Sequence, residues 1–359
     1  MNIGIAGAGL LGRLLTYTLT RQNHHVSIFD PASSPTARGA AGWTAAGMLS
    51  PTSELEAADL NVFDLGLRSL KRWAEIIPQL RQPVSLDHAG SLLLAHRHDA
   101  GAAQRIIQLL TQKAPPDYRP QAISLQQLAH YEPSVQGPSH AWLLPHEGHL
   151  NTVQGMQALY ASATTADWHW SEPVTELAAH TLVTAQRRYT FDWVFDVRGL
   201  GEKSAVAGEH ANEISCQNVR GVRGEIFWLH APGVKLNRPI RLLHPRHRVY
   251  LVPRVDDIIV VGATEIESED RSPVSLRSTV ELLAAAHSVI PALAEARVVH
   301  SETNLRPALI DNLPRIEHQS GLTRINGLFR HGWMISPALV DDALSRVFSE
   351  TPSLQRVDL

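Results

Sequence analysis

Hydrophobic and polar positions change period several times along the chain, and the N-terminal segment shows the clearest pattern. Residues 2–6 form a short apolar run that is typical of a buried strand, and residues 10–22 have the spacing of a helix. Residues 25–30, His-Val-Ser-Ile-Phe-Asp, indicate a second strand. This order of elements predicts a βαβ unit at the start of the chain.

The turn between the first strand and the helix contains a glycine pattern with a physical role. Gly7-Ala8-Gly9-Leu10-Leu11-Gly12 is a full G-x-G-x-x-G. Gly7 permits the tight turn, Gly9 lets backbone amides approach a pyrophosphate, and Gly12 allows close packing of helix on strand. The helix N-terminus adds partial positive charge. Asp30 ends the second strand, where a carboxylate accepts hydrogen bonds from an adenosine ribose. These features predict a dinucleotide site but do not separate NAD from FAD.

The later segments alternate between helical and strand-like patterns. Helices are predicted over 57–80, 99–113, 152–163 and 275–288, strands over 91–95, 222–230 and 247–263, a hairpin over 181–197 that ends in the apolar strand Trp193–Val197, and a closing strand, turn and helix over 323–348.

This order predicts two interleaved domains. The nucleotide domain takes residues 1–83, 146–215 and 300–359, and the substrate domain takes residues 84–145 and 216–299.

Composition removes several classes of function. The 44% hydrophobic and 19% charged residues are ordinary for a globular protein, and the net charge of -3 gives no footprint for nucleic acid. Cys216 is the only cysteine, which excludes an internal disulfide and every multi-cysteine metal site. His96-x-His98 lies beside no acidic ligand pair, His244-Pro-Arg-His247 borders a strand and is flanked by arginine, and H-E-x-x-H is absent, so no metal site is predicted.

The chain is expected to lie in the cytoplasm. No uninterrupted apolar run of about 18 residues occurs, so no membrane span is predicted. The apolar N-terminal stretch lacks the basic start and cleavage site of a signal peptide.

Segments beyond the glycine turn carry a resemblance to a known family. Residues 38–51, Arg-Gly-Ala-Ala-Gly-Trp-Thr-Ala-Ala-Gly-Met-Leu-Ser-Pro, resemble the flavin-contacting loop of the D-amino-acid oxidase superfamily, and within it the glycine oxidases of the thiamin pathway. Tyr250–Arg254, Val261–Asp270, Leu305–Asp311 and Asn326–Pro337 are also similar to family segments, in the family's order. The resemblance implies a Rossmann-like α/β domain that binds FAD, interleaved with an α+β substrate domain built on an antiparallel sheet.

The resemblance also implies which residues contact the cofactor. They are Gly7, Gly9, Leu10, Leu11, Gly12, Asp30, Ala45, Ala46, Gly47, Met48, Val174, Gly199, Gly332, Trp333, Met334, Ile335 and Ser336. Cys216 does not occupy the position where some relatives attach flavin, so noncovalent FAD is expected. Ser336 and Pro337 are expected to open a last helix over 338–348, whose N-terminus would stabilise reduced flavin.

Two positions depart from the family's pattern. Val197-Arg-Gly-Leu-Gly201 replaces the frequent Asn-Ala-x-Gly, so Arg198 changes contacts near the cofactor. Trp333 replaces a small or aliphatic residue and is expected to narrow the pocket.

Three side chains match the family's substrate site. Arg306, between Leu305 and Pro307, matches the carboxylate-binding arginine, and a guanidinium grips a carboxylate with two parallel hydrogen bonds. Tyr250 matches a second carboxylate ligand, and Arg330 matches an arginine near substrate and flavin. A structural arginine, a half-buried strand tyrosine and a surface salt bridge are the respective alternatives.

The resemblance predicts oxidative deamination of glycine or another small amino acid to the imine, then to keto acid and ammonia, while oxygen becomes hydrogen peroxide. A place in thiazole synthesis for thiamin and a homo-oligomer are also expected. A D-amino-acid or sarcosine oxidase or dehydrogenase is the alternative within the same chemistry. An NAD-dependent dehydrogenase and a non-catalytic dinucleotide-binding module are the alternatives from other classes. The preferred amine and the choice of oxygen or quinone stay open.

Overall fold

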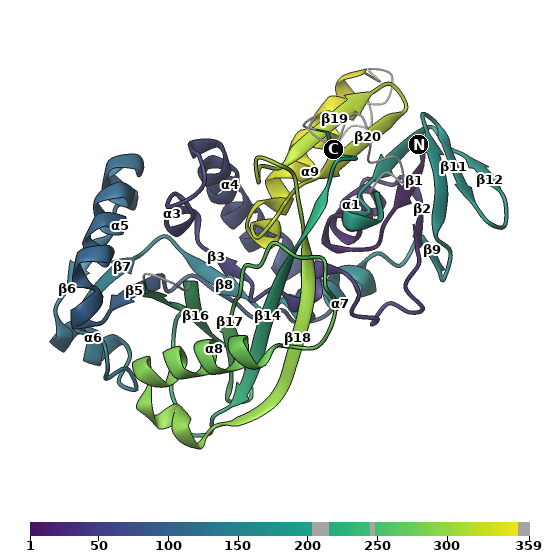
Figure 1. The fold of residues 1–359 in the computed structure, drawn as a ribbon. Coiled ribbons are helices and arrows are strands. Elements are labelled where there is room, and N and C mark those ends of the chain that lie inside the picture. The colour runs from purple at the N-terminus through teal and green to yellow at the C-terminus, as the bar shows by residue number, and fades with distance from the viewer. Residues whose placement is uncertain (203–214, 245–247, 351–359) are drawn as a thin grey trace.

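The computed structural model describes residues 1–202, 215–244 and 248–350 (Figure 1). A six-stranded sheet at one end of the molecule contains the N-terminal βαβ unit, in the order β19-β20-β13-β1-β2-β9. All neighbours in this sheet are parallel except the edge pair β19·β20. Its strands are β1 (Asn2–Ala6), β2 (His25–Asp30), β9 (Asp167–Trp170), β13 (Trp193–Asp196), β19 (Arg315–Gln319) and β20 (Leu322–Asn326). The predicted βαβ unit is confirmed, with helix α1 at Leu10–Arg21.

An eight-stranded sheet forms the other end of the molecule, in the order β18-β14-β17-β16-β15-β5-β7-β6. Its neighbours are antiparallel except for the pair β15·β5. Its strands are β5 (Ser91–Ala95), β6 (Gln121–Ile123), β7 (His140–Leu144), β14 (Arg220–His230), β15 (Ile240–Leu243), β16 (Arg248–Pro253), β17 (Ile258–Gly262) and β18 (Arg297–Ala308). In Figure 1 the long strands β14 and β18 run from this end toward the six-stranded sheet. The expected antiparallel sheet is confirmed.

Two small sheets and the helices complete the described chain. The small sheets are β3 (Met48–Leu49), β8 (Gly148–Leu150) and β4 (Leu86–Asp87), and β10 (Val174–Ala178), β11 (Thr181–Thr184) and β12 (Arg188–Thr190). The helices are α2 (Ala41–Thr44), α3 (Pro51–Glu54), α4 (Leu60–Ile76), α5 (Ala100–Lys113), α6 (Leu125–Tyr131), α7 (Thr152–Ser162), α8 (Leu276–Val289) and α9 (Gly332–Glu350). Short 3-10 turns lie at Ile77–Gln79, Arg97–Asp99, Pro116–Tyr118, Gly199–Glu202 and Pro291–Glu295.

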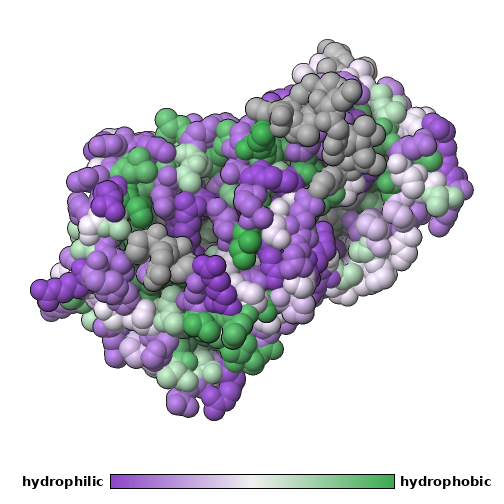
Figure 2. Space-filling view, viewed as in Figure 1, coloured by the Kyte–Doolittle hydropathy of each residue, from purple (hydrophilic) through white to green (hydrophobic). Residues whose placement is uncertain are grey.

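Each large sheet buries its own hydrophobic core. One core packs the six-stranded sheet against α1, α4 and α9, and includes the fully buried Ile5, Leu15 and Trp73. Another packs the eight-stranded sheet against α8. Exposed hydrophobic side chains include Leu276, Val280, Val298 and Val299, and Figure 2 shows hydrophobic surface over this lower part of the molecule. Among the described residues, no helix is both long and apolar enough to cross a membrane.

The predicted hairpin over 181–197 is only partly correct. Strands β11 and β12 pair as a hairpin, but β13 leaves it and pairs with β1 and β20 in the six-stranded sheet. All four residues of β13 are buried, as expected for the interior of a parallel sheet. The apolar run therefore marked a central strand rather than a hairpin arm.

The prediction for the last helix is wrong about its start. Helix α9 begins at Gly332 and continues through Pro337. Proline has no N–H to bond the carbonyl four residues earlier, which belongs to Trp333. That carbonyl instead accepts a hydrogen bond of 2.7 Å from the indole of Trp73. The N–H of Ala338 donates to Ser69 Oγ at 3.1 Å, so packing against α4 supplies hydrogen bonds where the proline interrupts the helix.

The division into two domains stays a prediction. Its boundary at residue 300 falls inside strand β18, which pairs with β14 over residues 297–308. A segment that crosses from one sheet region to the other without a break gives no local sign of a boundary in the sequence.

Candidate active site

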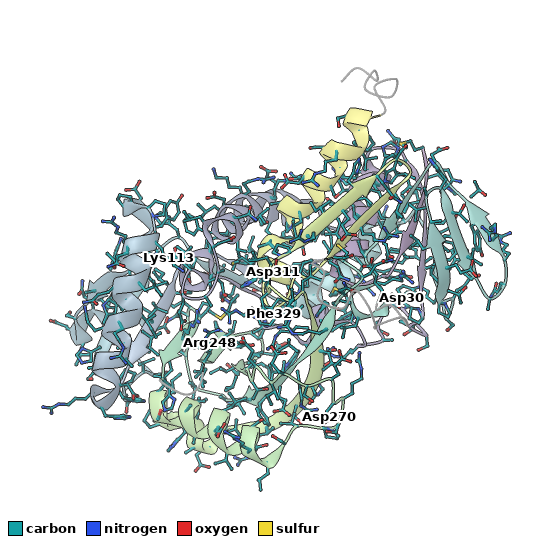
Figure 3. All side chains as sticks on the ribbon, turned by 45° about the horizontal axis from the view of Figure 1, so that its top comes forward. Asp30, Lys113, Arg248, Asp270, Asp311 and Phe329 are labelled. Carbon is teal, nitrogen blue, oxygen red and sulfur yellow. The ribbon has the colours of Figure 1, made fainter. Side chains whose placement is uncertain are left out.

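A cavity of about 760 Å³ lies between the two large sheets. At one end it meets the carboxyl ends of β1 and β2, where Gly7 and Asp30 line it, which is the usual ligand position in an open α/β sheet. At the other end it is lined by charged side chains of the eight-stranded sheet, among them Arg248 and Arg306. In the view of Figure 3, the cavity residue Phe329 lies between Asp30 and Arg248.

The first end is shaped by the glycine turn. Gly7 has φ +103°, and a Cβ there would lie 2.8 Å from the Val197 carbonyl oxygen. Gly9 is the N-cap of α1, and a Cβ on it would meet only Ala40 Cβ at 3.6 Å. The carboxylate of Asp30 accepts hydrogen bonds from the N–H groups of Ala8 (2.6 Å) and Ala32 (2.8 Å). The turn thus holds a helix N-terminus open toward the cavity, as a diphosphate requires.

A buried arginine that the sequence analysis missed lies beside this turn. Arg13 lines the cavity and donates to the carbonyl oxygens of Ala8, Met156 and Pro35 at 2.7–2.9 Å. Its guanidinium also lies over the Trp43 ring, 5.1 Å from the centroid. Burial lowers the pKa of Arg13 to about 10, against the opposing charge of Asp30. The signal in the sequence was an arginine directly after the third glycine, on the buried face of the helix.

The predicted flavin loop lines the middle of the cavity. Residues Ala45–Met48 all contribute, and Gly47 has φ +73°, a conformation that favours glycine. Arg254, the last residue of the Tyr250–Arg254 segment, donates to the Ala46 carbonyl oxygen. Burial lowers the pKa of Arg254 to about 10. This hydrogen bond ties the loop to the residue that directly follows strand β16.

Most of the predicted cofactor residues come together here. The residues that line the cavity are Gly7, Gly9, Leu10, Leu11, Asp30, Ala45, Ala46, Gly47, Met48, Val174, Gly199, Gly332, Trp333 and Met334. Gly12, Ile335 and Ser336 are not among the lining residues. A Cβ on Gly12 would overlap the Gly7 carbonyl oxygen, so Gly12 acts in packing. Ile335 and Ser336 are buried within α9, because that helix begins earlier than predicted.

The two departures from the family pattern have local partners. Arg198 forms an ion pair with the buried Asp196 at 2.6 Å and donates to the Val174 carbonyl oxygen at 3.3 Å. The indole of Trp333 donates to the Gly42 carbonyl oxygen at 2.9 Å and lies 5.4 Å from the ring of Trp73. Both side chains are thus held by protein contacts at the wall of the cavity.

Arg306 and Tyr250 lie together at the second end of the cavity. The Arg306 guanidinium donates to the carbonyl oxygens of Thr264 (3.0 Å) and Arg223 (3.3 Å). It lies against Gly224, where any Cβ would overlap it. Burial raises the pKa of the Tyr250 hydroxyl, although the positive charge of Arg306 opposes the rise, so the hydroxyl stays protonated. Among the described residues, Arg306 has no carboxylate within ion-pair distance.

Arg330 has a different environment, because two carboxylates already bind it. Its guanidinium donates to Glu54 Oε2 at 2.7 Å and to Glu265 Oε2 at 2.9 Å. The charges of Arg330, His331 and Arg241 outweigh desolvation and lower the pKa of Glu54 to about 2. Burial lowers the pKa of His331 to about 4, so this histidine is neutral near pH 7. Glu54 was missed because α3 is only four residues long and has no periodic pattern.

Two further arginines complete this end. Arg241 on β15 binds Glu56 at 2.7 Å, and Arg248 on β16 lies 3.6 Å from the same carboxylate. Neither was predicted as a site residue, because a strand arginine is more often on a solvent face. In the described part of the chain, no group of three or more His, Cys, Asp or Glu side chains is arranged to hold a metal.

Known proteins share the features of this chain over nearly its whole length. A model of the FAD dependent oxidoreductase (DAO) family matches residues 2–341. The chain belongs to this family. The putative thiamine biosynthesis oxidoreductase ThiO of Rhizobium etli is 32% identical over 99% of this chain and 99% of its own length. The glycine oxidase of Geobacillus kaustophilus is 24% identical over 96% of this chain and 93% of its own length.

A solved structure has the same fold. The crystal structure of glycine oxidase from Geobacillus kaustophilus superposes with a TM-score of 0.82 at 24% identity, covering 97% of this chain and 94% of that one. The family membership assigns FAD, which the glycine pattern alone leaves open, and makes the chain an oxidoreductase. The geometry fits FAD: the glycine turn and Arg13 suit its diphosphate, and the loop at Ala45–Met48 lies farther along the same cavity.

Proposed function

We propose that the chain oxidises the amino group of glycine or another small amino acid. FAD, when bound, accepts the hydride, and the released imine hydrolyses to a keto acid and ammonia. The names of the relatives from Rhizobium etli and Geobacillus kaustophilus support this proposal. The chain's own contribution is to hold the carboxylate and orient the carbon that loses hydrogen.

The observation that carries the proposal is the difference between the two predicted arginines. Arg330 is bound by Glu54 and Glu265. Arg306 faces the same cavity, bonds two carbonyl oxygens and the Tyr250 hydroxyl, and forms no ion pair among the described residues. A partly buried guanidinium without a counterion favours an anionic ligand, and a substrate carboxylate supplies one.

The neighbouring residues then take distinct roles. The protonated hydroxyl of Tyr250 can donate to the same carboxylate as Arg306. Arg330 is a positioning residue, held by Glu54 beside the start of α9. The neutral His331 adds no charge near the amine, which must be uncharged to lose hydride.

Replacing Arg306 tests the proposal. In Arg306→Ala, kcat/KM for glycine should fall roughly thirty- to a thousand-fold, which corresponds to a loss of about 2–4 kcal/mol of transition-state stabilisation. Arg306→Lys keeps the charge but loses the planar fork, so it should show a smaller loss. A simple amine without a carboxylate should lose far less in both variants. Equal losses for the two substrates at matched flavin content would make Arg306 a structural residue.

Acetate provides a readout without turnover. It carries the carboxylate but no amine, so it should perturb the flavin absorption of the wild type and bind much more weakly to Arg306→Ala. Unchanged acetate binding would place the carboxylate site elsewhere.

We also propose that oxygen is the electron acceptor and that the product is used in thiazole synthesis. We further propose that the chain forms a homo-oligomer and lies in the cytoplasm. The exposed Leu276, Val280, Val298 and Val299 support a contact between copies, which light scattering can test. The single buried cysteine fits a reducing compartment.

A further inference from the structure

A second arginine faces the cavity at a more exposed position than Arg306. Arg248 precedes Tyr250 by two residues on strand β16, so both side chains lie on the same face of the strand. Both line the cavity. The Arg248 side chain is 39% exposed, and Figure 3 labels it at the opposite side of Phe329 from Asp30. The substrate end of the cavity therefore presents two arginines from different depths.

Arg248 is held loosely by its protein partners. Its nitrogens lie 3.6 Å from Glu56 and 3.7 Å from Glu265, beyond hydrogen-bond distance. Each of these carboxylates has a closer partner, because Arg241 binds Glu56 at 2.7 Å and Arg330 binds Glu265 at 2.9 Å. The donors of Arg248 are therefore available to an anion in the cavity.

The charge balance also permits a second anion. Four arginines and three glutamates lie at this end among the described residues: Arg241, Arg248, Arg306 and Arg330, and Glu54, Glu56 and Glu265. Once a first carboxylate binds Arg306, these charges sum to zero, so a second acid group meets no net negative charge that would repel it.

We propose that Arg248 binds a second acid group of the substrate, so that the chain accepts amines carrying a carboxylate in addition to the one held by Arg306. The added acid is either a carboxymethyl group on the nitrogen or an acidic side chain. This inference rests on the proposed function, because it assigns the first carboxylate to Arg306.

A matched pair of ligands without an amine separates the two carboxylate sites. Oxydiacetate carries two carboxylates, and methoxyacetate carries one on a similar ether. Isothermal titration of the flavin-loaded protein should give a Kd for oxydiacetate about ten-fold below that for methoxyacetate. In Arg248→Gln this ratio should fall to about one, while the Kd for methoxyacetate stays the same. Arg248→Lys should keep part of the ratio, because it keeps the charge.

Arg271→Gln serves as the control, since Arg271 is exposed and also lines the cavity. It should keep the wild-type ratio. A ratio of one in the wild type, an unchanged ratio in Arg248→Gln, or an equal fall in Arg271→Gln would overturn the role of Arg248. The proposed function stands apart: loss of methoxyacetate binding in Arg306→Ala supports it, whatever the ratio. Failure of both acids to bind the wild type would overturn both proposals.

Discussion

The two ends of the cavity are both suited to anionic groups, but one is formed by backbone and the other by side chains. The glycine end is formed by backbone from residues close in sequence, at the turn between β1 and α1. The substrate end is formed by side chains from α3, β15, β16 and β18 and from the segment before α9. Each end nevertheless contains one arginine that forms no ion pair among the described residues. Arg13 donates to three carbonyl oxygens, and Arg306 bonds two carbonyl oxygens and the Tyr250 hydroxyl.

The two ends should therefore respond to different kinds of substitution. The glycine end should be disrupted by added side chains, because a single Cβ can overlap backbone or occupy the site of the diphosphate. The substrate end should be disrupted by changes of charge, because Glu54 and Glu265 pair with Arg330 and leave Arg306 available to a ligand. A desolvated cation with no carboxylate in ion-pair contact favours an anionic ligand, and among the described residues Arg13 and Arg306 are both in this situation, one at each end.

The largest effect is expected at the glycine end, from two neighbouring substitutions. Gly12→Ala should prevent folding, because its Cβ overlaps the Gly7 carbonyl oxygen. Gly9→Ala should fold, since its Cβ meets only Ala40 Cβ at 3.6 Å, but should lose most of its flavin. Soluble yield and the flavin-to-protein absorbance ratio measure both. The control Gly101→Ala, with no atom near its Cβ, should behave as wild type. A Gly9→Ala protein with a full complement of flavin would show that the diphosphate does not bind at this turn.

The same contrast explains what could be predicted from sequence. The glycine end was predictable because a turn, a helix N-terminus and Asp30 are local features with fixed spacing. Arg306 and Tyr250 were identified only through family resemblance. Glu54, Arg241 and Arg248 escaped notice because nothing in their local sequence states which distant residues they meet. The start of α9 was missed because Trp73, over 250 residues earlier in the chain, bonds the carbonyl that Pro337 leaves free.

Loss of a charge at the substrate end should lower the stability of the fold. Glu54→Gln leaves the enclosed Arg330 with one carboxylate in place of two, and should lower the free energy of unfolding by about 3 kcal/mol. Urea denaturation at pH 7 measures the change. Glu75→Gln breaks the exposed ion pair with Arg72 and should cost less than about 1 kcal/mol. A Glu54→Gln protein as stable as the control would mean that the charge network contributes little to folding.

Two buried histidines should make the stability of the fold depend on pH. The pKa values of His331 and His149 are lowered from 6.5 to about 4 by burial. The unfolded chain therefore binds protons more readily between these values, and stability falls as pH drops from 6.5 toward 4. Between pH 6 and 5, each histidine should contribute a loss of up to about 1.4 kcal/mol. His331→Gln should lose about that much less than the wild type, as measured by urea denaturation at both pH values. Equal losses would mean that His331 is not held neutral.

The smallest effect is expected from the hydroxyl beside Arg306. Tyr250→Phe removes one donor to the substrate carboxylate and keeps the ring that packs with Ala46 and Val252. Because the raised pKa keeps the hydroxyl protonated, it acts as a neutral donor, and its loss should lower kcat/KM for glycine about ten-fold with little change in stability. Tyr118→Phe, whose ring lies edge-on to Phe63 and does not line the cavity, is the control and should keep full activity. The amine without a carboxylate should be unaffected by either change. A loss in Tyr250→Phe as large as in Arg306→Ala would show that the two side chains act as one unit, and the assignment of most carboxylate binding to the arginine would then fail.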